Sequence, residues 1–185
     1  MSYLKPKAVT SIIFLLLIAL IFINLQKVKP NDHTTVEEAM NYAGIDYDEI
    51  YYIIENIGNN IIFYGKDDIF SVGLVTKNRS KYQWIYGFGS KQFNETDQIL
   101  TRAFTNLPTK ESANDDELVS LTFGVINDED IEELKIQYKD QLLRNATIIP
   151  TSKGPIWFCF SDTPVNYDPD VVRIYKNGET RPGWY

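Results

Sequence analysis

The chain has 185 residues, of which 44% are hydrophobic and 14% aromatic, and a net charge of −7 at pH 7. This apolar content excludes a disordered chain and predicts one domain, or two small ones, with a real core. Residues 30–185 hold 14 of the 18 basic residues and all 25 acidic ones, a net charge of −11 that argues against nucleic-acid binding and favours a basic protein or peptide as partner.

The amino-terminal segment 8–25, AVTSIIFLLLIALIFINL, contains no charged residue. A helix of this length spans about 27 Å, close to the hydrocarbon thickness of a bilayer. We therefore expect a short cytoplasmic tail at 1–7, a single-pass transmembrane signal anchor at 8–25, a tether at 26–33 and an acidic extracytoplasmic domain of the cell envelope at 34–185. A cleaved signal peptide is the alternative, although no small residues follow the apolar run. Lysines flank both ends of the run, so the orientation depends on a short basic tail staying in the cytoplasm.

The domain at 34–185 is predicted to be α+β, a β-rich domain with antiparallel sheets and one or two short helices. A first helix is expected at 35–43, because Thr34 and Thr35 each precede a glutamate by three residues, the pattern of a capping box. Gly44 would end this helix.

Nine strands are predicted from β-rich runs separated by turn residues, at 50–57, 60–65, 69–76, 82–89, 118–126, 134–138, 146–150, 156–160 and 171–175. The first four follow one another so closely that they permit an antiparallel meander and exclude parallel crossovers. The Asn-Gly pair in YKNGET is a hairpin signal near the end of the chain, although the tail that follows, RPGWY, is too short and Pro-containing for much of a partner strand.

Between the two groups of strands, NETDQILTRAFTNLP (94–108) is expected to be helical, because Ile99, Ala103 and Leu107 are spaced by four and Pro108 would close the helix. The polar stretch that follows, 109–117, is the best candidate for a subdomain boundary.

The stretch KYQWIYGFGS places four aromatic residues at every second position: Tyr82, Trp84, Tyr86 and Phe88. In a strand these rings share one face. A hairpin of 69–76 with 82–89, closed by a five-residue loop, would pair Leu74 with Trp84. The stripe would then be sheet core, with an exposed ligand platform as the alternative. The opposite face, rich in Gly and Ser, would let the helix at 35–43 approach closely.

Familiar catalytic and metal sites are not predicted. His33, the single histidine, lies on the tether, and Cys159, the single cysteine, lies between two phenylalanines, so neither a nucleophile–histidine pair nor a zinc site can be assembled. The carboxylates leave one enzymatic alternative, a glycan-acting envelope enzyme that uses a pair such as Asp162 and Asp168.

The apolar leader VTSIIFLLLIALIFIN, the hairpin GLVTKNRSKYQWIYGF and the stretch FGVINDEDIEELKIQ followed by IWFCF together resemble the small signal-anchored, uncharacterised extracytoplasmic proteins of Gram-positive bacteria. The resemblance covers most of the chain at the level of pattern. It implies export from the cytoplasm and supplies no catalytic residues.

We therefore expect a non-enzymatic, membrane-anchored binding or interaction module without catalytic residues, metal or cofactor. Its contact residues are predicted among the exposed aromatics, namely Tyr51, Tyr64, Trp157 and Trp184. The alternatives are the glycan-acting enzyme and an immunity-type protein whose acidic face neutralises a basic peptide or toxin. Binding by such an acidic face would weaken as salt is added.

Overall fold

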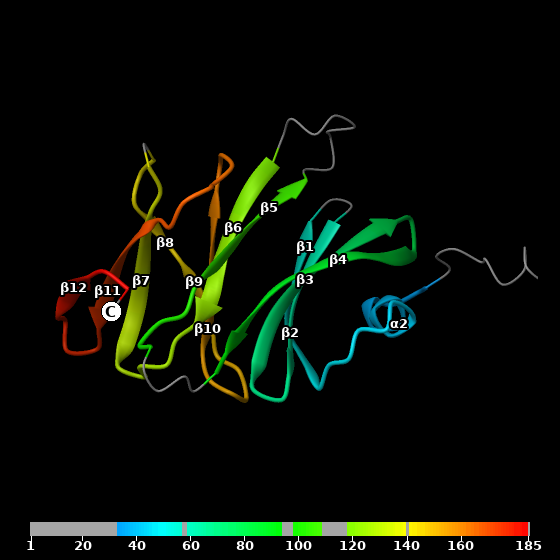
Figure 1. The fold of residues 1–185 in the computed structure, drawn as a ribbon, viewed down its shortest axis with the longest axis horizontal. Helices are drawn as coiled ribbons and strands as arrows, with labels where there is room; N and C mark the ends of the chain where they lie inside the picture. Colours follow the sequence, from blue (N-terminus) through cyan, green and yellow to red (C-terminus); the bar gives the residue numbers. More distant parts are fainter. Residues whose placement is uncertain (1–32, 57–58, 94–97, 109–117, 140, 185) are drawn as a thin grey trace, which may run out of the picture.

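The computed structural model describes residues 33–56, 59–93, 98–108, 118–139 and 141–184 (Figure 1). The predicted tail 1–7, the predicted span 8–25, most of the tether and the predicted boundary 109–117 lie outside the described residues.

The first sheet is an antiparallel meander in the order β1-β2-β3-β4. Its strands are β1 (Glu49–Asn56), β2 (Asn59–Lys66), β3 (Ile69–Asn78) and β4 (Lys81–Gln92). The helix α2 (Val36–Tyr42) precedes it. The predicted capping box is confirmed, since Thr35 accepts a hydrogen bond from Glu38 N at 3.1 Å, and Gly44 follows the helix in the left-handed region with a φ of 73°.

The remaining strands form two further antiparallel sheets, one in the order β5-β6-β10-β9 and one in the order β12-β11-β7-β8. The middle sheet contains β5 (Ala103–Pro108), β6 (Leu118–Val125), β9 (Thr147–Ile149) and β10 (Ile156–Ser161). The third sheet contains β7 (Ile131–Gln137), β8 (Arg144–Asn145), β11 (Asp170–Tyr175) and β12 (Thr180–Pro182).

The three sheets are stacked, and α2 covers the outer face of the first (Figure 1). Each gap contains its own apolar core. The core between the first and middle sheets contains Phe63, Phe70, Phe123 and Phe158. The core between the middle and third sheets contains Leu134, Tyr138 and Trp157. The core between α2 and the first sheet contains Met40, Ile62 and Val75. Strands buried on both faces explain the nearly continuous apolar runs of β2 and β10.

The predicted α+β class is wrong, because the structure is β-rich, with three antiparallel sheets and one short helix among the described residues. The helix expected around 94–108 is replaced at 103–108 by β5, which pairs with β6 along its whole length. The spacing of four from Ala103 to Leu107 fits one face of a helix, but it is also an even number and therefore fits one face of a strand. Pairing with β6 decides between the two.

The expected single-pass signal anchor has no counterpart among the described residues, since none of their helices is long and apolar enough to cross a membrane. The segment for which that anchor was predicted, 8–25, is outside those residues.

The β3–β4 hairpin is present, but its register differs from the predicted one. Trp84 pairs with Val75 and Tyr86 with Leu74, so Ile85 is an extra residue opposite an uninterrupted β3. Such a β-bulge reverses the faces of the residues that follow it.

The bulge divides the aromatic stripe between two cores. Tyr82 and Trp84 pack against the core under α2, whereas Tyr86 and Phe88 pack against the core shared with the middle sheet. All four rings are partly buried, so the expected packing role holds while the single shared face does not. The small residue Gly73 was expected to let the helix approach closely. Instead, the space beside Gly73 is filled by the Trp84 ring.

Candidate functional site

Three of the four aromatic residues predicted to bind a ligand are buried. Tyr64 and Trp184 are each 8% exposed and Trp157 is fully buried, so a ligand has no access to these rings. Trp157 and Trp184 lie together with ring centroids 5.8 Å apart, and their indole N–H groups donate to backbone carbonyls. Tyr64 packs edge-on against Trp84 in a different core.

The fourth, Tyr51, is half-buried over Gly65 and beside Phe93, at a corner where acidic residues gather. Burial raises the pKa of Tyr51, and the nearby carboxylates of Glu49 and Asp48 raise it further. Of the four aromatic residues predicted to bind a ligand, Tyr51 is thus the one that is partly exposed next to acidic side chains.

The carboxylates at this corner are largely engaged within the protein. Asp48 accepts a hydrogen bond from Asp67 N at 2.7 Å and pairs with Lys66 at 3.1 Å, and these contacts, that from Asp67 first, lower the pKa of Asp48. Lys153 pairs with Asp68 at 3.5 Å. These contacts stabilise the β2–β3 turn, and a basic partner for this corner stays a prediction.

The two carboxylates considered for a glycan-acting enzyme each face an arginine. Asp168 binds Arg102 at 2.6 Å, and Asp162 forms a two-pronged pair with Arg144. In the part of the chain that the structure describes, no group of three or more His, Cys, Asp or Glu side chains is placed to hold a metal ion.

The single histidine and the single cysteine do not form a catalytic pair. His33 lies beside Tyr42, with the two rings tilted and their centroids 4.6 Å apart, and its carbonyl accepts a hydrogen bond from Tyr82 N. Cys159 is 4% exposed in the core between the middle and third sheets, and burial raises the pKa of its thiol. A thiol held neutral and away from solvent is a poor nucleophile.

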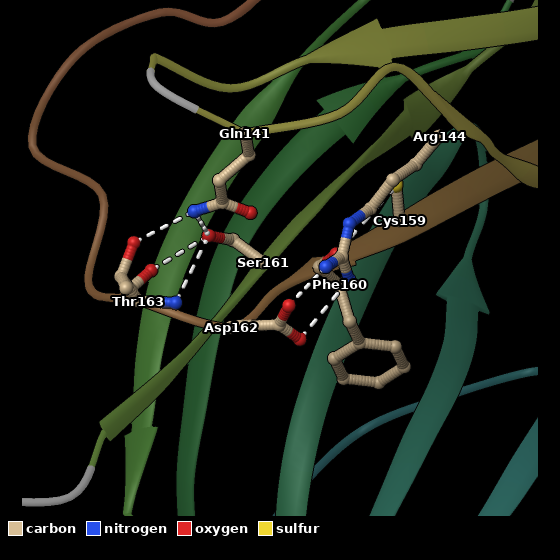
Figure 2. Close-up of polar contacts among 7 residues, drawn as sticks. All are labelled: Gln141, Arg144, Cys159, Phe160, Ser161, Asp162 and Thr163. Carbon is tan, nitrogen blue, oxygen red and sulfur yellow. Dashed lines mark hydrogen bonds and ion pairs between the residues drawn. The ribbon is translucent and has the colours of Figure 1, made fainter.

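A polar network joins the loop between β7 and β8 to the end of β10 (Figure 2). Gln141 donates from its amide to Ser161 Oγ at 2.9 Å and to Thr163 Oγ1 at 2.7 Å. Ser161 Oγ in turn donates to Thr163 O at 2.7 Å, and Gln137 donates to the carbonyl of Gln141. One end of the loop is therefore held by side-chain and backbone contacts together.

Arg144 holds the other end of the loop. Its guanidinium donates to Phe160 O at 3.2 Å and to both carboxylate oxygens of Asp162 (Figure 2). The Asp162 carboxylate, the largest cause, raises the pKa of Arg144 further above its ordinary value. A planar, bidentate pair of this kind fixes orientation as well as position.

Between these two anchors lie Leu142 and Leu143, which are 86% and 45% exposed. Leu142 is the most exposed of the large apolar side chains that the structure describes. In the sequence these two residues form an apolar pair inside the polar stretch KDQLLRN, a signal too short to predict a role. We call Leu142, Leu143 and their anchors Gln141 and Arg144 the leucine loop.

Comparison with known proteins adds no assignment: no protein-family model, no curated protein and no solved structure matches the chain.

Proposed function

We propose that the protein is a non-enzymatic binding module that docks on a partner protein through the leucine loop. The observation that supports this most strongly is the 86% exposure of Leu142 between two residues that are both held in place. Isolated exposed apolar residues are ordinary on protein surfaces. Two adjacent exposed leucines on a loop that is held by hydrogen bonds at both ends are less common.

The energetics favour such a role. Burying a leucine side chain contributes about 1.5–3 kcal/mol, so a pocket that takes Leu142 and Leu143 gains several kcal/mol from two residues. Because Gln141 and Arg144 already hold the loop, little ordering entropy is lost on binding. One atom of the network, Gln141 Oε1, is buried and accepts no hydrogen bond from the described residues. An unsatisfied buried acceptor of this kind costs about 1–3 kcal/mol.

The partner we propose is a protein with an apolar pocket and a net positive charge. The net charge of −11 over residues 30–185 attracts such a partner and repels an acidic one. The same field repels anionic lipid surfaces, which makes a protein pocket the better counterpart for the two leucines.

Selection of peptides from an unbiased library on the immobilised full-length protein tests the proposal, because such libraries sample the surfaces best suited to binding. We expect the selected peptides to combine large apolar residues with Lys or Arg. Isothermal titration calorimetry then measures the affinity of these peptides for the unmodified protein and for Leu142→Asn. The affinity should be about tenfold or more lower for Leu142→Asn, because one leucine is no longer buried in the complex.

The matched control is Ile69→Asn, because Ile69 is 44% exposed, close to the 45% of Leu143, but lies on β3 away from the leucine loop. Affinity should be retained in Ile69→Asn and lost in Leu143→Asn. Peptides that bind Leu142→Asn and the unmodified protein equally would overturn the proposal, as would a set of selected peptides without basic residues.

A further inference from the structure

The β3–β4 hairpin ends in a turn on the side of the molecule that carries α2, away from the middle and third sheets (Figure 1). Asn78 pairs with Lys81, so Arg79 and Ser80 alone form the turn in place of the predicted five-residue loop. Next to the turn lies an open hollow of about 620 Å³. Its lining combines amides, hydroxyls and cations, contributed by Thr76, Asn78, Arg79, Ser80, Lys81, Tyr82 and Gln83.

One wall of the hollow is a polar continuation of a core face. Thr76 pairs with Gln83 and Asn78 with Lys81, and side chains of directly paired residues lie on the same face. By alternation along β3, Thr76 and Asn78 continue the row of Phe70, Val72 and Leu74, which is buried against the middle sheet. Toward the hairpin end, the residues of this row therefore change from apolar ones to ones that can form hydrogen bonds.

The charge at this end is opposite to that of the protein as a whole. Lys77, Arg79 and Lys81 fall within five consecutive residues that include no acid. Five cations elsewhere lie against carboxylates, namely Lys66, Arg102, Arg144, Lys153 and Arg181. Lys77 instead lies 5.1 Å from the centroid of the Tyr82 ring.

The backbone of the turn is strained at Arg79, which has a φ of 57°. Glycine is the usual residue at such a position, since its lack of a Cβ removes the steric cost. Strained backbone conformations of this kind concentrate at functional sites. Here the residue with the left-handed backbone, Arg79, is one of those that line the hollow.

We infer that this hollow is a binding site for a carboxylate-bearing oligosaccharide. The cations Arg79 and Lys81 meet the sugar carboxylates, and the amides of Asn78 and Gln83 and the hydroxyls of Thr76 and Ser80 meet the ring hydroxyls. Arginine in particular recognises carboxylates in a bidentate manner. This site is independent of the leucine loop, which belongs to the third sheet.

An acidic peptide is the less suitable occupant. Peptides that bind at a sheet commonly add a strand to a free edge. At this end of β4 the edge is occupied, because Tyr82 N donates to His33 O at 2.8 Å. A saccharide needs only side-chain donors and acceptors, and those are what the hollow offers.

Titration of the full-length protein with a tetramer of galacturonic acid, followed by calorimetry at low and high salt, tests this inference. We expect saturable binding that weakens with salt. It should weaken about tenfold for each cation removed in Arg79→Gln and Lys81→Gln, the loss expected for a charge-assisted hydrogen bond. Lys139→Gln/Lys176→Gln, which removes two exposed lysines elsewhere, is the matched control and should bind as tightly as the unmodified protein.

Two comparison ligands separate the possible sources of binding. A neutral glucose tetramer should bind much more weakly than the uronate, and tetraglutamate should not compete with it. Absence of uronate binding, equal loss in the control variant, or tetraglutamate that binds as well as the uronate would each overturn the assignment. Far-UV circular dichroism of each variant confirms that a lost affinity is not a lost fold.

Discussion

The ring of Trp84 lies directly over the backbone of Gly73, in the space that a side chain at position 73 would fill. A Cβ atom at Gly73 would come within 2.5 Å of Cζ3 of the indole and closer still to Cη2. The bulge at Ile85 brings Trp84 opposite Val75 and so makes this contact possible. The glycine is therefore required by the aromatic ring across the hairpin.

Gly73→Ala should lower the free energy of unfolding by about 1–3 kcal/mol, because the ring must move out of a packed position. Urea unfolding measures the loss. Gly178→Ala is a control of a different kind: Gly178 has a φ of 82° but no atom within 4 Å of its Cβ position, so its cost is backbone strain alone. In Gly73→Ala the fluorescence of Trp84 should shift, and in Gly178→Ala it should not. An unchanged stability of Gly73→Ala would contradict the observed register.

Replacing Arg79 by glycine should have the opposite effect on stability. Because Arg79 has a φ of 57°, Arg79→Gly relieves a left-handed strain and should raise the free energy of unfolding by about 0.5–1 kcal/mol. The neighbouring Ser80 is not in the positive-φ region, so Ser80→Gly should lower stability slightly. Thermal unfolding of the pair checks the prediction. Equal effects of the two substitutions would mean that the turn has another conformation.

The N-cap of α2 should contribute about 1 kcal/mol. Thr35 Oγ1 accepts from Glu38 N at 3.1 Å, while the Glu38 carboxylate accepts from Thr34 N at 2.7 Å. Thr35→Ala removes one partner of an otherwise unsatisfied backbone donor, and Thr35→Ser keeps it. Chemical denaturation should show a loss for the alanine variant alone; a similar loss in the serine variant would point to the methyl group instead.

Alkaline pH should destabilise the protein through Tyr138 and Cys159. Burial raises the pKa of both groups above their ordinary values. In the range between the ordinary and the raised pKa, the unfolded chain has lost a proton that the folded protein keeps, so stability falls as pH rises. The free energy of unfolding should therefore decline above about pH 8.5, where an ordinary thiol titrates, and more steeply above about pH 10.

Tyr138→Phe should make the steeper part of that decline clearly shallower, because burial raises the pKa of Tyr138 strongly. At neutral pH it should cost about 1–3 kcal/mol, because the hydroxyl donates to Cys159 O at 3.0 Å and lies 2.9 Å from Thr122 Oγ1 in a fully buried site. Tyr42→Phe, at an exposed position, is the control and should change neither quantity. Unfolding curves at several pH values give both. A Tyr138→Phe variant with the alkaline slope of the unmodified protein would show that Tyr138 does not cause it.

The sequence predicted the strands better than their arrangement. Alternation and turn residues located the four strands of the first sheet, and the Asn-Gly pair located the β11–β12 hairpin. Local pattern could not reveal the bulge at Ile85, because one extra residue leaves the composition of a strand unchanged while it reverses the faces beyond it. It also could not distinguish a helix from a strand where Ala103 and Leu107 are spaced by four.

The candidate site was the least predictable feature. Aromatic residues such as Trp157 were chosen as binding residues for their chemistry, yet the stacking of three sheets buries large rings on both faces of the middle sheet. The leucine loop depends on contacts between Gln141 and Ser161, twenty positions apart, and between Arg144 and Asp162. No short-range pattern in the chain reports such contacts.

The most direct test of the proposed docking surface is the backbone order of the leucine loop in the free, full-length protein. Amide ¹⁵N relaxation should give order parameters of about 0.8 or more for Leu142 and Leu143, typical of a rigid backbone. In Asp162→Asn, which breaks the pair with Arg144, the values should fall toward about 0.6. Order parameters below about 0.6 in the unmodified protein would show that the leucines are not held ready for a partner, and would contradict the proposed docking surface.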